Sequence, residues 1–402
     1  MTYRRLYARN LHMVQSLRFH LRILGTRGIP ARHGGFETFA EQLAVFLVEK
    51  GWSVTVYCQE DNRGKIHEDN WCGIRLVYVP VAIPGPAGTI AFDWQSTLHA
   101  MRESGLVLTL GYNTAVFGIF YRLKGIANLI NMDGIEWRRK KWGWLAKTWF
   151  WMNHWAGCWV SNHLIADNPE IKLHLATTVT DEKITMIPYG SKLVESGDPS
   201  VLQRYGLRPR GYATIIARPE PENSILEMVL AWSRKPRRMK LLVLGQYNIA
   251  NAYQRMVLEA ASEEVVFPGA IYDQARLEAI RFHAAFYMHG HQVGGTNPSL
   301  VEAMGAGNAI LAHDNNYNRW VAGAGALYFR DEKECAELIE RLAFDESLVN
   351  TLGMSSRDRH SSLFQLDNIL AQYEECLAKW ACPLEDLTVA GHSVKRYSPI
   401  DK

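Results

Sequence analysis

The stretch 290–307 combines residue types that could bind phosphate and ribose, because it is rich in glycine and contains Asn297 and Glu302. Short apolar runs at 284–289 and 309–312 flank it and are typical of buried strands. Asn297 can cap the helix that follows, and free N–H groups at such a helix N-terminus bind phosphate. One turn further, Glu302 could accept both hydroxyls of a ribose. The pattern indicates a nucleotide site; an ordinary strand–turn–helix unit with a solvated Glu302 is the alternative.

A second candidate group follows the apolar run 212–217. Arg218 comes directly after this run, and a guanidinium can bind phosphate through two parallel hydrogen bonds. No Asp-x-Asp pair occurs in the chain, so we expect no divalent ion that holds a diphosphate. The charge of a departing diphosphate would then be met by Arg218 and by helix N-termini. The polar segment 314–319 follows the next strand and could close over the ligand.

The loop after the first predicted strand, 21–26, carries His33, Gly34, Gly35 and Glu37. It lies at the carboxyl end of a strand, where open parallel sheets bind their ligands. The pattern G-x-G-x-x-G is absent, so the loop lacks a dinucleotide fingerprint. Paired glycines would also suit a tight strand–helix turn, but the length and basic residues of the loop favour a functional role.

Two acidic residues follow another predicted strand, 127–134: Asp133 at its end and Glu136 just beyond. A carboxylate in this position could orient or deprotonate an acceptor hydroxyl. The pair Asp133–Gly134 is equally an ordinary turn signal, and the residues alone leave both interpretations open.

The segment 137–159 contains seven of the thirteen tryptophans together with five basic residues. This mixture suits the headgroup region of an anionic membrane and predicts peripheral contact with the inner membrane. Single-stranded nucleic acid could also stack on it, but no nucleic-acid-binding fold accompanies it. A helix whose tryptophans pack inward under a cationic face is the remaining alternative.

Apolar runs alternate with helical periodicity along the whole chain, which predicts an α/β protein with two Rossmann-like domains whose parallel sheets face a central cleft. The polar stretch 191–211 has the composition of a linker. The predicted parts are a basic arm at 1–20, an acceptor domain at 21–195, a nucleotide-sugar domain at 196–362, and a C-terminal helix and tail at 363–402 that crosses back to the first domain.

The bulk properties narrow the class of protein further. The chain has 402 residues with 44 basic and 41 acidic side chains, so its net charge of +3 gives no nucleic-acid signal. Its six cysteines lack the spacing of a metal site or a disulfide framework, which fits a reducing cytoplasm. Neither a secretory signal nor a membrane span is visible. We therefore expect a cytoplasmic protein at the inner face of the plasma membrane.

Four motifs, in this order along the chain, resemble those of the retaining GT-B glycosyltransferases of family 4. The motifs occupy 34–37, 133–137, 218–223 and 294–304, and the resemblance covers 21–380. The closest subgroup is the bacterial rhamnosyltransferase-like proteins with a DUF1972-type N-terminal domain. The resemblance implies transfer of rhamnose or a similar hexose from a nucleotide diphosphate-sugar to a lipid-linked or oligosaccharide acceptor, with retention, in cell-surface polysaccharide biosynthesis.

The resemblance also assigns roles to individual residues. It places Glu302 on the donor ribose and the backbone amides of Ser299 and Leu300 on the diphosphate. The other expected donor-side residues are Arg218, Asn223, Gly294, Gly295, Thr296 and Asn297. In two places the chain departs from the family. The first acid of a paired-glutamate motif falls at Gly294, and a basic residue that usually follows the arginine is Asn223. The first departure affects the contact to the transferred sugar, and the second affects the contact to the leaving group.

Asp133, Glu37 and Arg218 are the expected catalytic residues, with His33, Gly34, Gly35 and Glu136 on the acceptor side. An enzyme of this type would use front-face displacement, in which the departing phosphate takes the acceptor proton, so no side-chain nucleophile, metal or cofactor is expected. Three other functions remain open. They are a nucleotide-sugar 2-epimerase, a non-catalytic scaffold with a degenerate donor site, and a nucleic-acid binder.

Overall fold

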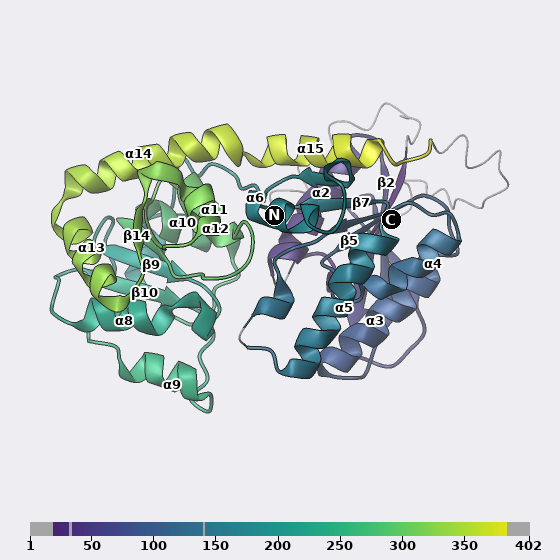
Figure 1. Cartoon of the computed structure of the whole chain (residues 1–402). Coiled ribbons are helices and arrows are strands. Elements are labelled where there is room, and N and C mark those ends of the chain that lie inside the picture. The colour runs from purple at the N-terminus through teal and green to yellow at the C-terminus, as the bar shows by residue number, and fades with distance from the viewer. Residues whose placement is uncertain (1–18, 32–33, 140, 384–402) are drawn as a thin grey trace. The chain divides into compact units, whose positions relative to one another are not determined.

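The computed structural model describes residues 19–31, 34–139 and 141–383, and it is an α/β structure with two mostly parallel sheets (Figure 1). The described residues divide into two compact units. The first comprises residues within 19–130, 160–162 and 374–383, and the second comprises residues within 131–159 and 163–373.

The first sheet has eight strands in the order β3-β4-β2-β1-β5-β6-β7-β8. They are β1 (His20–Leu24), β2 (Ser53–Glu60), β3 (His67–Trp71), β4 (Ile74–Pro80), β5 (Leu106–Leu110), β6 (Asn128–Asn131), β7 (His163–Ala166) and β8 (Ile184–Met186). Strands β4, β2, β1 and β5 pair in parallel, as do β7 and β8, whereas β3 pairs antiparallel with β4. The accompanying helices are α2 (Gly35–Glu49), α3 (Gly85–Ala100), α4 (Gly118–Leu123), α5 (Trp144–Val160) and α6 (Pro169–Ala176).

The second sheet has six parallel strands in the order β11-β10-β9-β12-β13-β14. They are β9 (Tyr212–Ile216), β10 (Lys240–Leu244), β11 (Val265–Val266), β12 (Phe286–His289), β13 (Ala309–His313) and β14 (Leu327–Phe329). The helices are α7 (Ser200–Gln203), α8 (Ile225–Ser233), α9 (Ala252–Glu259), α10 (Gln274–His283), α11 (Pro298–Gly305), α12 (Asn316–Ala322), α13 (Glu332–Phe344), α14 (Glu346–Leu363) and α15 (Leu366–Ala378).

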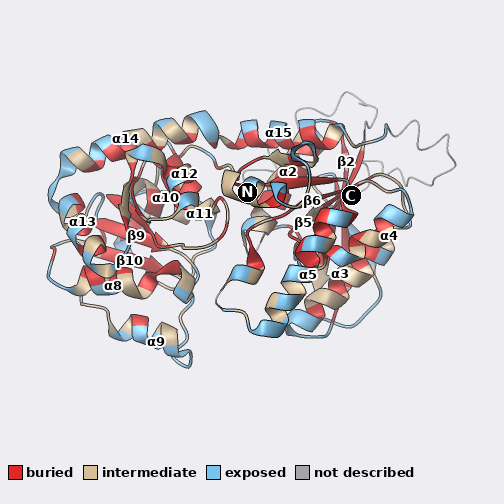
Figure 2. Cartoon of the chain, viewed as in Figure 1, coloured by how far each residue is buried: buried red, intermediate tan, exposed pale blue. Residues whose placement is uncertain are grey.

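Helices cover both faces of the second sheet, which explains why its strands are continuous apolar runs. Successive side chains of a strand point to opposite faces. In β12, Phe286 and Met288 pack in one cluster with Trp232 of α8, whereas Tyr287 packs in another cluster with Leu300 of α11. Figure 2 shows the result, with buried strands under helices that are exposed on their outer side. Because helices cover both faces of the sheet, the loops at the carboxyl ends of these strands are where a ligand can bind.

The alternation of strands and helices that the sequence predicts is confirmed, and the differences have local causes. Strand β3 (His67–Trp71) was not predicted because its residues are polar and mostly exposed, which hides the hydrophobic signal of an edge strand. The strand predicted at 127–134 is shorter and ends at Asn131, because Asp133 has a left-handed backbone with φ of +50°.

Two predicted segments also differ in detail. The predicted linker 191–211 contains the short helix α7, and the predicted C-terminal helix is α15, which α14 precedes directly. Residue Glu374 of α15 belongs to the first unit, where its carboxylate accepts a hydrogen bond from the Trp52 indole at 3.3 Å. Most of the predicted arm 1–20 lies outside the described residues.

Candidate functional site

The glycine-rich turn after β12 leads into α11, and Asn297 caps this helix as the sequence predicts. Its side-chain oxygen accepts the Ser299 amide at 3.0 Å, and its carbonyl accepts the Leu300 amide at 3.1 Å. The cap therefore engages both amides that the resemblance assigns to the diphosphate. Among the described residues, no protein acceptor faces the amides of Gly294 and Gly295, so these two N–H groups can bind an anion.

Asp167 holds the same turn from the end of β7. Its carboxylate Oδ2 accepts the Thr296 amide at 3.0 Å, and the Thr296 hydroxyl donates to the Asp167 carbonyl. A Cβ added at Gly295 would lie 1.9 Å from Asp167 Oδ1, so only glycine allows this close approach. Asp167 was not among the predicted site residues. The available signal was an acidic residue directly after a predicted strand at 160–166.

The surroundings of the Asp167 carboxyl favour its protonated form at pH 7. The residue is 2% exposed, and Oδ1 has no hydrogen-bond partner among the described residues. Burial raises the pKa of Asp167 to about 8, and the negative charge of Asp133 raises it further against the opposing effect of the Thr296 amide. A carboxyl that keeps its proton can donate a hydrogen bond as well as accept one.

Asp133 lies in a strained loop that approaches the glycine turn. Its backbone has φ of +50°, which is uncommon for a residue other than glycine, and its amide donates to Asn131 Oδ1 at 2.9 Å. A Cβ added at the next residue, Gly134, would lie 2.8 Å from the Cα atom of Gly294. Two of the four motifs, 133–137 and 294–304, therefore meet within the second unit.

Glu136 takes part in a buried ion-pair network. Its Oε1 atom lies 2.7 Å from Arg139 Nε, and the Trp142 indole donates to Oε2 at 3.1 Å. Arg139 also donates to Glu222 at 3.0 Å. Burial raises the pKa of Glu136, and the Arg139 charge acts against this shift. Because its carboxylate is already engaged, Glu136 can position the loop that carries Asp133.

Arg218 and His291 are linked through Asn223. Arg218 is exposed, and its carbonyl accepts the Asn223 side-chain amide at 2.7 Å. The remaining oxygen of Asn223 lies 2.6 Å from His291 Nδ1, which must therefore carry the proton and leave Nε2 as an acceptor. Burial lowers the pKa of His291 well below its ordinary value, and neighbouring positive charges, including Arg218, add to this. His291 is a neutral site residue that the sequence motifs did not single out.

The backbone explains why glycine occupies position 294. Its φ of +116° is strained for any L-residue with a side chain. A Cβ added there would lie 3.0 Å from His291 Nε2. The departure from the paired-glutamate motif is therefore part of the turn geometry, because a glutamate at 294 would require a different backbone.

Arg281 of α10 holds Glu302, the predicted ribose ligand. Arg281 Nη2 donates to Glu302 Oε2 and lies 3.4 Å from Ser299 Oγ. The Arg281 side chain is 3% exposed, whereas that of Glu302 is 26% exposed. A buried cation thus fixes a carboxylate that solvent and ligands can still reach. Arg281 is a second site residue that was not predicted from the sequence, where it appears as a cation between the apolar residues Ile280 and Phe282.

Comparisons with known proteins identify the fold. Residues 18–192 match the model of the family described as Domain of unknown function (DUF1972). No curated protein sequence matches the chain. Sucrose-phosphate synthase (tll1590) from Thermosynechococcus elongatus is similar in structure, with a TM-score of 0.75 and 18% identity over 93% of this chain and 100% of that one.

Two further solved structures are similar over most of their length. Anabaena Alr3699/HepE in complex with UDP and glucose has a TM-score of 0.70 and 14% identity, over 90% of this chain and 100% of that one. The α,α-trehalose-phosphate synthase (UDP-forming) from Burkholderia xenovorans has a TM-score of 0.70 and 13% identity, over 89% of this chain and 99% of that one. The chain has the GT-B fold. At these identities the similarity concerns the fold alone.

The remaining predicted residues of this GT-B chain lie in its first unit and are described by themselves. Gly34 is the N-cap residue of α2, and Gly35 is its exposed first residue. Glu37 is buried, and its Oε1 atom accepts the Arg27 amide at 3.1 Å, so it holds the loop after β1. His33 lies outside the described residues. The acceptor-side role of this loop stays a prediction.

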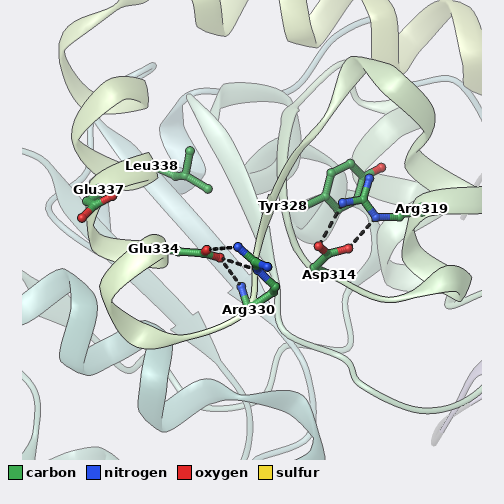
Figure 3. Close-up of a pocket in the computed structure, with 7 residues that line it drawn as sticks. All are labelled: Asp314, Arg319, Tyr328, Arg330, Glu334, Glu337 and Leu338. Carbon is green, nitrogen blue, oxygen red and sulfur yellow. Dashed lines mark hydrogen bonds and ion pairs between the residues drawn. The ribbon is translucent and has the colours of Figure 1, made fainter.

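In the segment 314–319, the Asn315 and Asn318 side chains donate to the His291 carbonyl at 3.0 and 2.9 Å, whereas Asp314 and Arg319 line a polar pocket (Figure 3). Closure of this segment over a ligand stays a prediction. Asp314 pairs with Arg319 at 2.5 Å, and the Arg319 guanidinium lies 4.5 Å from the Tyr328 ring centre. Arg330 pairs with Glu334 in the same pocket. The exposed Glu337 also lines this pocket, beside the two ion pairs.

Two general features of the GT-B chain concern the residues that the structure describes. No three His, Cys, Asp or Glu side chains there are grouped in a way that could hold a metal ion. No helix within 19–31, 34–139 and 141–383 has both the length and the apolar character of a membrane span.

Proposed function

We propose that this chain is a glycosyltransferase that moves a sugar from a nucleotide diphosphate donor to an acceptor hydroxyl. The observation that carries the proposal is the Glu302 carboxylate, which a buried Arg281 holds beside the glycine turn of a GT-B fold. The fold supports the same reaction class, since it is shared with the UDP-forming α,α-trehalose-phosphate synthase and with HepE, which has been solved in complex with UDP-glucose.

The donor would bind along the residues that surround the turn. Glu302 accepts the ribose hydroxyls, because its carboxylate is partly exposed and its rotamer is fixed by Arg281. Arg218 meets the diphosphate, since its guanidinium is exposed and has no carboxylate partner among the described residues. The unbonded amides of Gly294 and Gly295 add two donors to the same anion. The proposal needs neither a metal nor a cofactor.

The reaction that fits these groups is a front-face displacement. The bond between the anomeric carbon and the diphosphate oxygen breaks, and the acceptor oxygen forms the new bond on the same face. The acceptor proton passes to the departing phosphate, so the configuration is retained without a protein nucleophile. Arg218 stabilises the charge that develops on the leaving group. Asp133, whose loop approaches the glycine turn, orients the acceptor.

The identity of the substrates is the finer part of the proposal. The resemblance favours rhamnose or a similar hexose and a lipid-linked or oligosaccharide acceptor in cell-surface polysaccharide synthesis, at the cytoplasmic face of the membrane. The match of residues 18–192 to DUF1972 agrees with the subgroup on which this resemblance rests. The absence of an acidic side chain at Gly294 supports a donor sugar that needs no carboxylate there. A neutral acceptor, His291 Nε2, faces the same position.

A ligand screen followed by a transfer assay tests the proposal. We expect dTDP-, UDP- or GDP-sugars to raise the melting temperature, because a ligand that binds only the folded state stabilises it. The best donor should then yield a glycosylated acceptor, and Arg218→Met should lower the transfer rate by at least about tenfold. The exposed Arg276→Met on α10 is the matched control. Formation of a C2-epimeric nucleotide sugar without an acceptor would establish the epimerase instead, and absence of nucleotide binding would favour a scaffold.

A further inference from the structure

One face of α5 exposes large aromatic side chains. Trp144, Trp151, Trp155 and Trp159 are 74%, 48%, 47% and 81% exposed. All thirteen tryptophans of the chain lie in the described residues, and these four are the exposed ones. The others are at least half buried, as Trp52 and Trp232 illustrate with almost no exposed surface. The fold therefore does not expose tryptophan in general; it does so on this helix.

The spacing places the four rings on one side of the helix. At about 100° per residue, the offsets of 7, 11 and 15 residues from Trp144 put them within an arc of roughly 80°. Met152 is 54% exposed and extends the same arc. The opposite side is buried and includes Asn153, His154 and Gly157. Figure 2 shows α5 with exposed and buried sides of this kind. The helix therefore packs on the protein through one face and presents the tryptophans on the other.

The charge next to this face is positive. The stretch 137–160 contains five Lys and Arg residues and no Asp or Glu. Just before the helix, the exposed Arg138 guanidinium lies 5.0 Å from the Trp137 ring centre. The Lys141 ammonium lies 4.9 Å from the Trp142 ring centre, but it also lies 3.8 Å from the Glu222 carboxylate, which offsets its charge. Lys147 is half-buried on the helix itself. Cations that flank exposed indoles are complementary to a negatively charged surface with an apolar layer beneath it.

We propose that the exposed tryptophan face of α5 binds the surface of an anionic lipid bilayer, with the helix axis in the plane of the interface. Indole rings are stable at the boundary between headgroups and acyl chains because one edge is polar and the rest is apolar. Arg138 and Lys147 then meet the lipid phosphates. This proposal stands independently of sugar transfer, although it would place the enzyme beside a lipid-linked acceptor.

Sedimentation with vesicles tests the surface on the full chain. We expect binding to vesicles of phosphatidylcholine with phosphatidylglycerol, and weaker binding to phosphatidylcholine alone. The triple variant Trp151→Ser, Trp155→Ser and Trp159→Ser should lower the partition coefficient by at least about tenfold. A matched control replaces three exposed apolar residues elsewhere by serine: Ile249, Met256 and Met354. This control should bind as the unmodified chain does.

Substitution of single basic residues tests the electrostatic contribution to vesicle binding. Arg138→Gln and Lys147→Gln should each lower binding to the anionic vesicles about fivefold, because a cation near such a surface contributes about that factor. Lys333→Gln on α13 is exposed and serves as the control. Higher salt should weaken binding by the unmodified chain and have less effect on the Arg138 and Lys147 variants.

Measuring how deeply the tryptophans enter the bilayer distinguishes binding to lipid from binding to another partner. Vesicles with brominated acyl chains should quench the tryptophan fluorescence of the unmodified chain but not that of the triple variant. Absence of binding to anionic vesicles would overturn the proposal, and so would equal binding by the triple variant and the unmodified chain. If the unmodified chain instead forms a dimer that does not bind vesicles, and the triple variant is monomeric, the tryptophan face is a dimer interface and the proposal is wrong. Thermal shift by the best nucleotide sugar should be the same in all variants, which keeps this test separate from that of the proposed transfer.

Discussion

Asp167 and Thr296 are joined by two hydrogen bonds, although 129 residues separate them in the chain. The Thr296 amide donates to Asp167 Oδ2 at 3.0 Å, and the Thr296 hydroxyl donates to the Asp167 carbonyl. Both residues are buried. The pair therefore sets the position of the glycine turn, and with it the two amides of Gly294 and Gly295 that remain available for a ligand.

Removing the Asp167 carboxyl should disturb this turn. Asp167→Ala leaves the buried Thr296 amide without its acceptor, which costs about 1–3 kcal/mol in the free energy of unfolding. Asp167→Asn keeps an oxygen acceptor in the same place and should retain nucleotide binding. Denaturant unfolding and a nucleotide titration of both variants measure the difference. Equal stability and equal affinity of Asp167→Ala and the unmodified chain would show that the pair does not hold the turn.

The raised pKa of Asp167 predicts a specific pH dependence of stability. The unfolded carboxyl ionises near its ordinary pKa of about 3.9, whereas burial raises the folded value to about 8. Between these values the folded state keeps a proton that the unfolded state has lost. The free energy of unfolding therefore falls as pH rises through this window, by about 1.4 kcal/mol per pH unit, and levels off above pH 8. Asn cannot ionise, so Asp167→Asn lacks this loss.

The stability difference between Asp167→Asn and the unmodified chain should accordingly grow from pH 5 to pH 8. Asp93→Asn is a matched control, because Asp93 is a second carboxyl whose pKa desolvation raises, to about 7. Its difference should level off about one pH unit lower. Denaturant curves at a series of pH values provide the measurement. Parallel curves for Asp167→Asn and the unmodified chain would mean that Asp167 ionises at an ordinary pKa.

Restoring an acidic residue at position 294 should not restore a glutamate contact. The backbone at Gly294 has φ of +116°, so a side chain there costs about 1–3 kcal/mol. Gly294→Glu and Gly294→Ala should lose similar stability, because the penalty comes from the backbone and not from the carboxylate. Thermal unfolding compares the two. A Gly294→Glu variant as stable as the unmodified chain and more active with the same donor would contradict this account.

The ion pair between Arg281 and Glu302 should respond unequally to removal of its two members. Glu302→Ala strands a cation that is 3% exposed, at a cost of about 3–5 kcal/mol. Arg281→Met should cost less, because the Glu302 carboxylate is 26% exposed and can be solvated. Arg281→Met should still weaken nucleotide affinity about tenfold, since Glu302 loses its fixed rotamer.

Glu302→Gln is the better variant for testing the ribose contact, because its oxygen can still accept from Arg281. Glu337→Gln on α13, an exposed residue, is its control. Chemical unfolding and calorimetric titration separate the two effects of each substitution. Greater destabilisation by Arg281→Met than by Glu302→Ala would show that the cation is not the buried partner.

The features that depend on neighbouring residues follow from the sequence by itself. Apolar periodicity over a few turns determined the alternation of strands and helices, and Asn297 followed by Pro298 determined the start of α11. Edge strand β3 could not be predicted in this way, because polar, exposed residues carry no periodic signal. The position of Glu302 on α11 also follows from the sequence, since only a few residues separate it from the cap, while its contact with ribose stays a prediction.

The tertiary structure decided the rest, because it depends on contacts between residues far apart in the chain. Only packing shows that Asp167 binds Thr296, that Arg281 holds Glu302, and that the cap engages the Ser299 and Leu300 amides. The spacing of the α5 tryptophans shows which rings share a face, but not whether that face is covered. Burial of the opposite face against the protein settles this, and leaves the tryptophan face exposed.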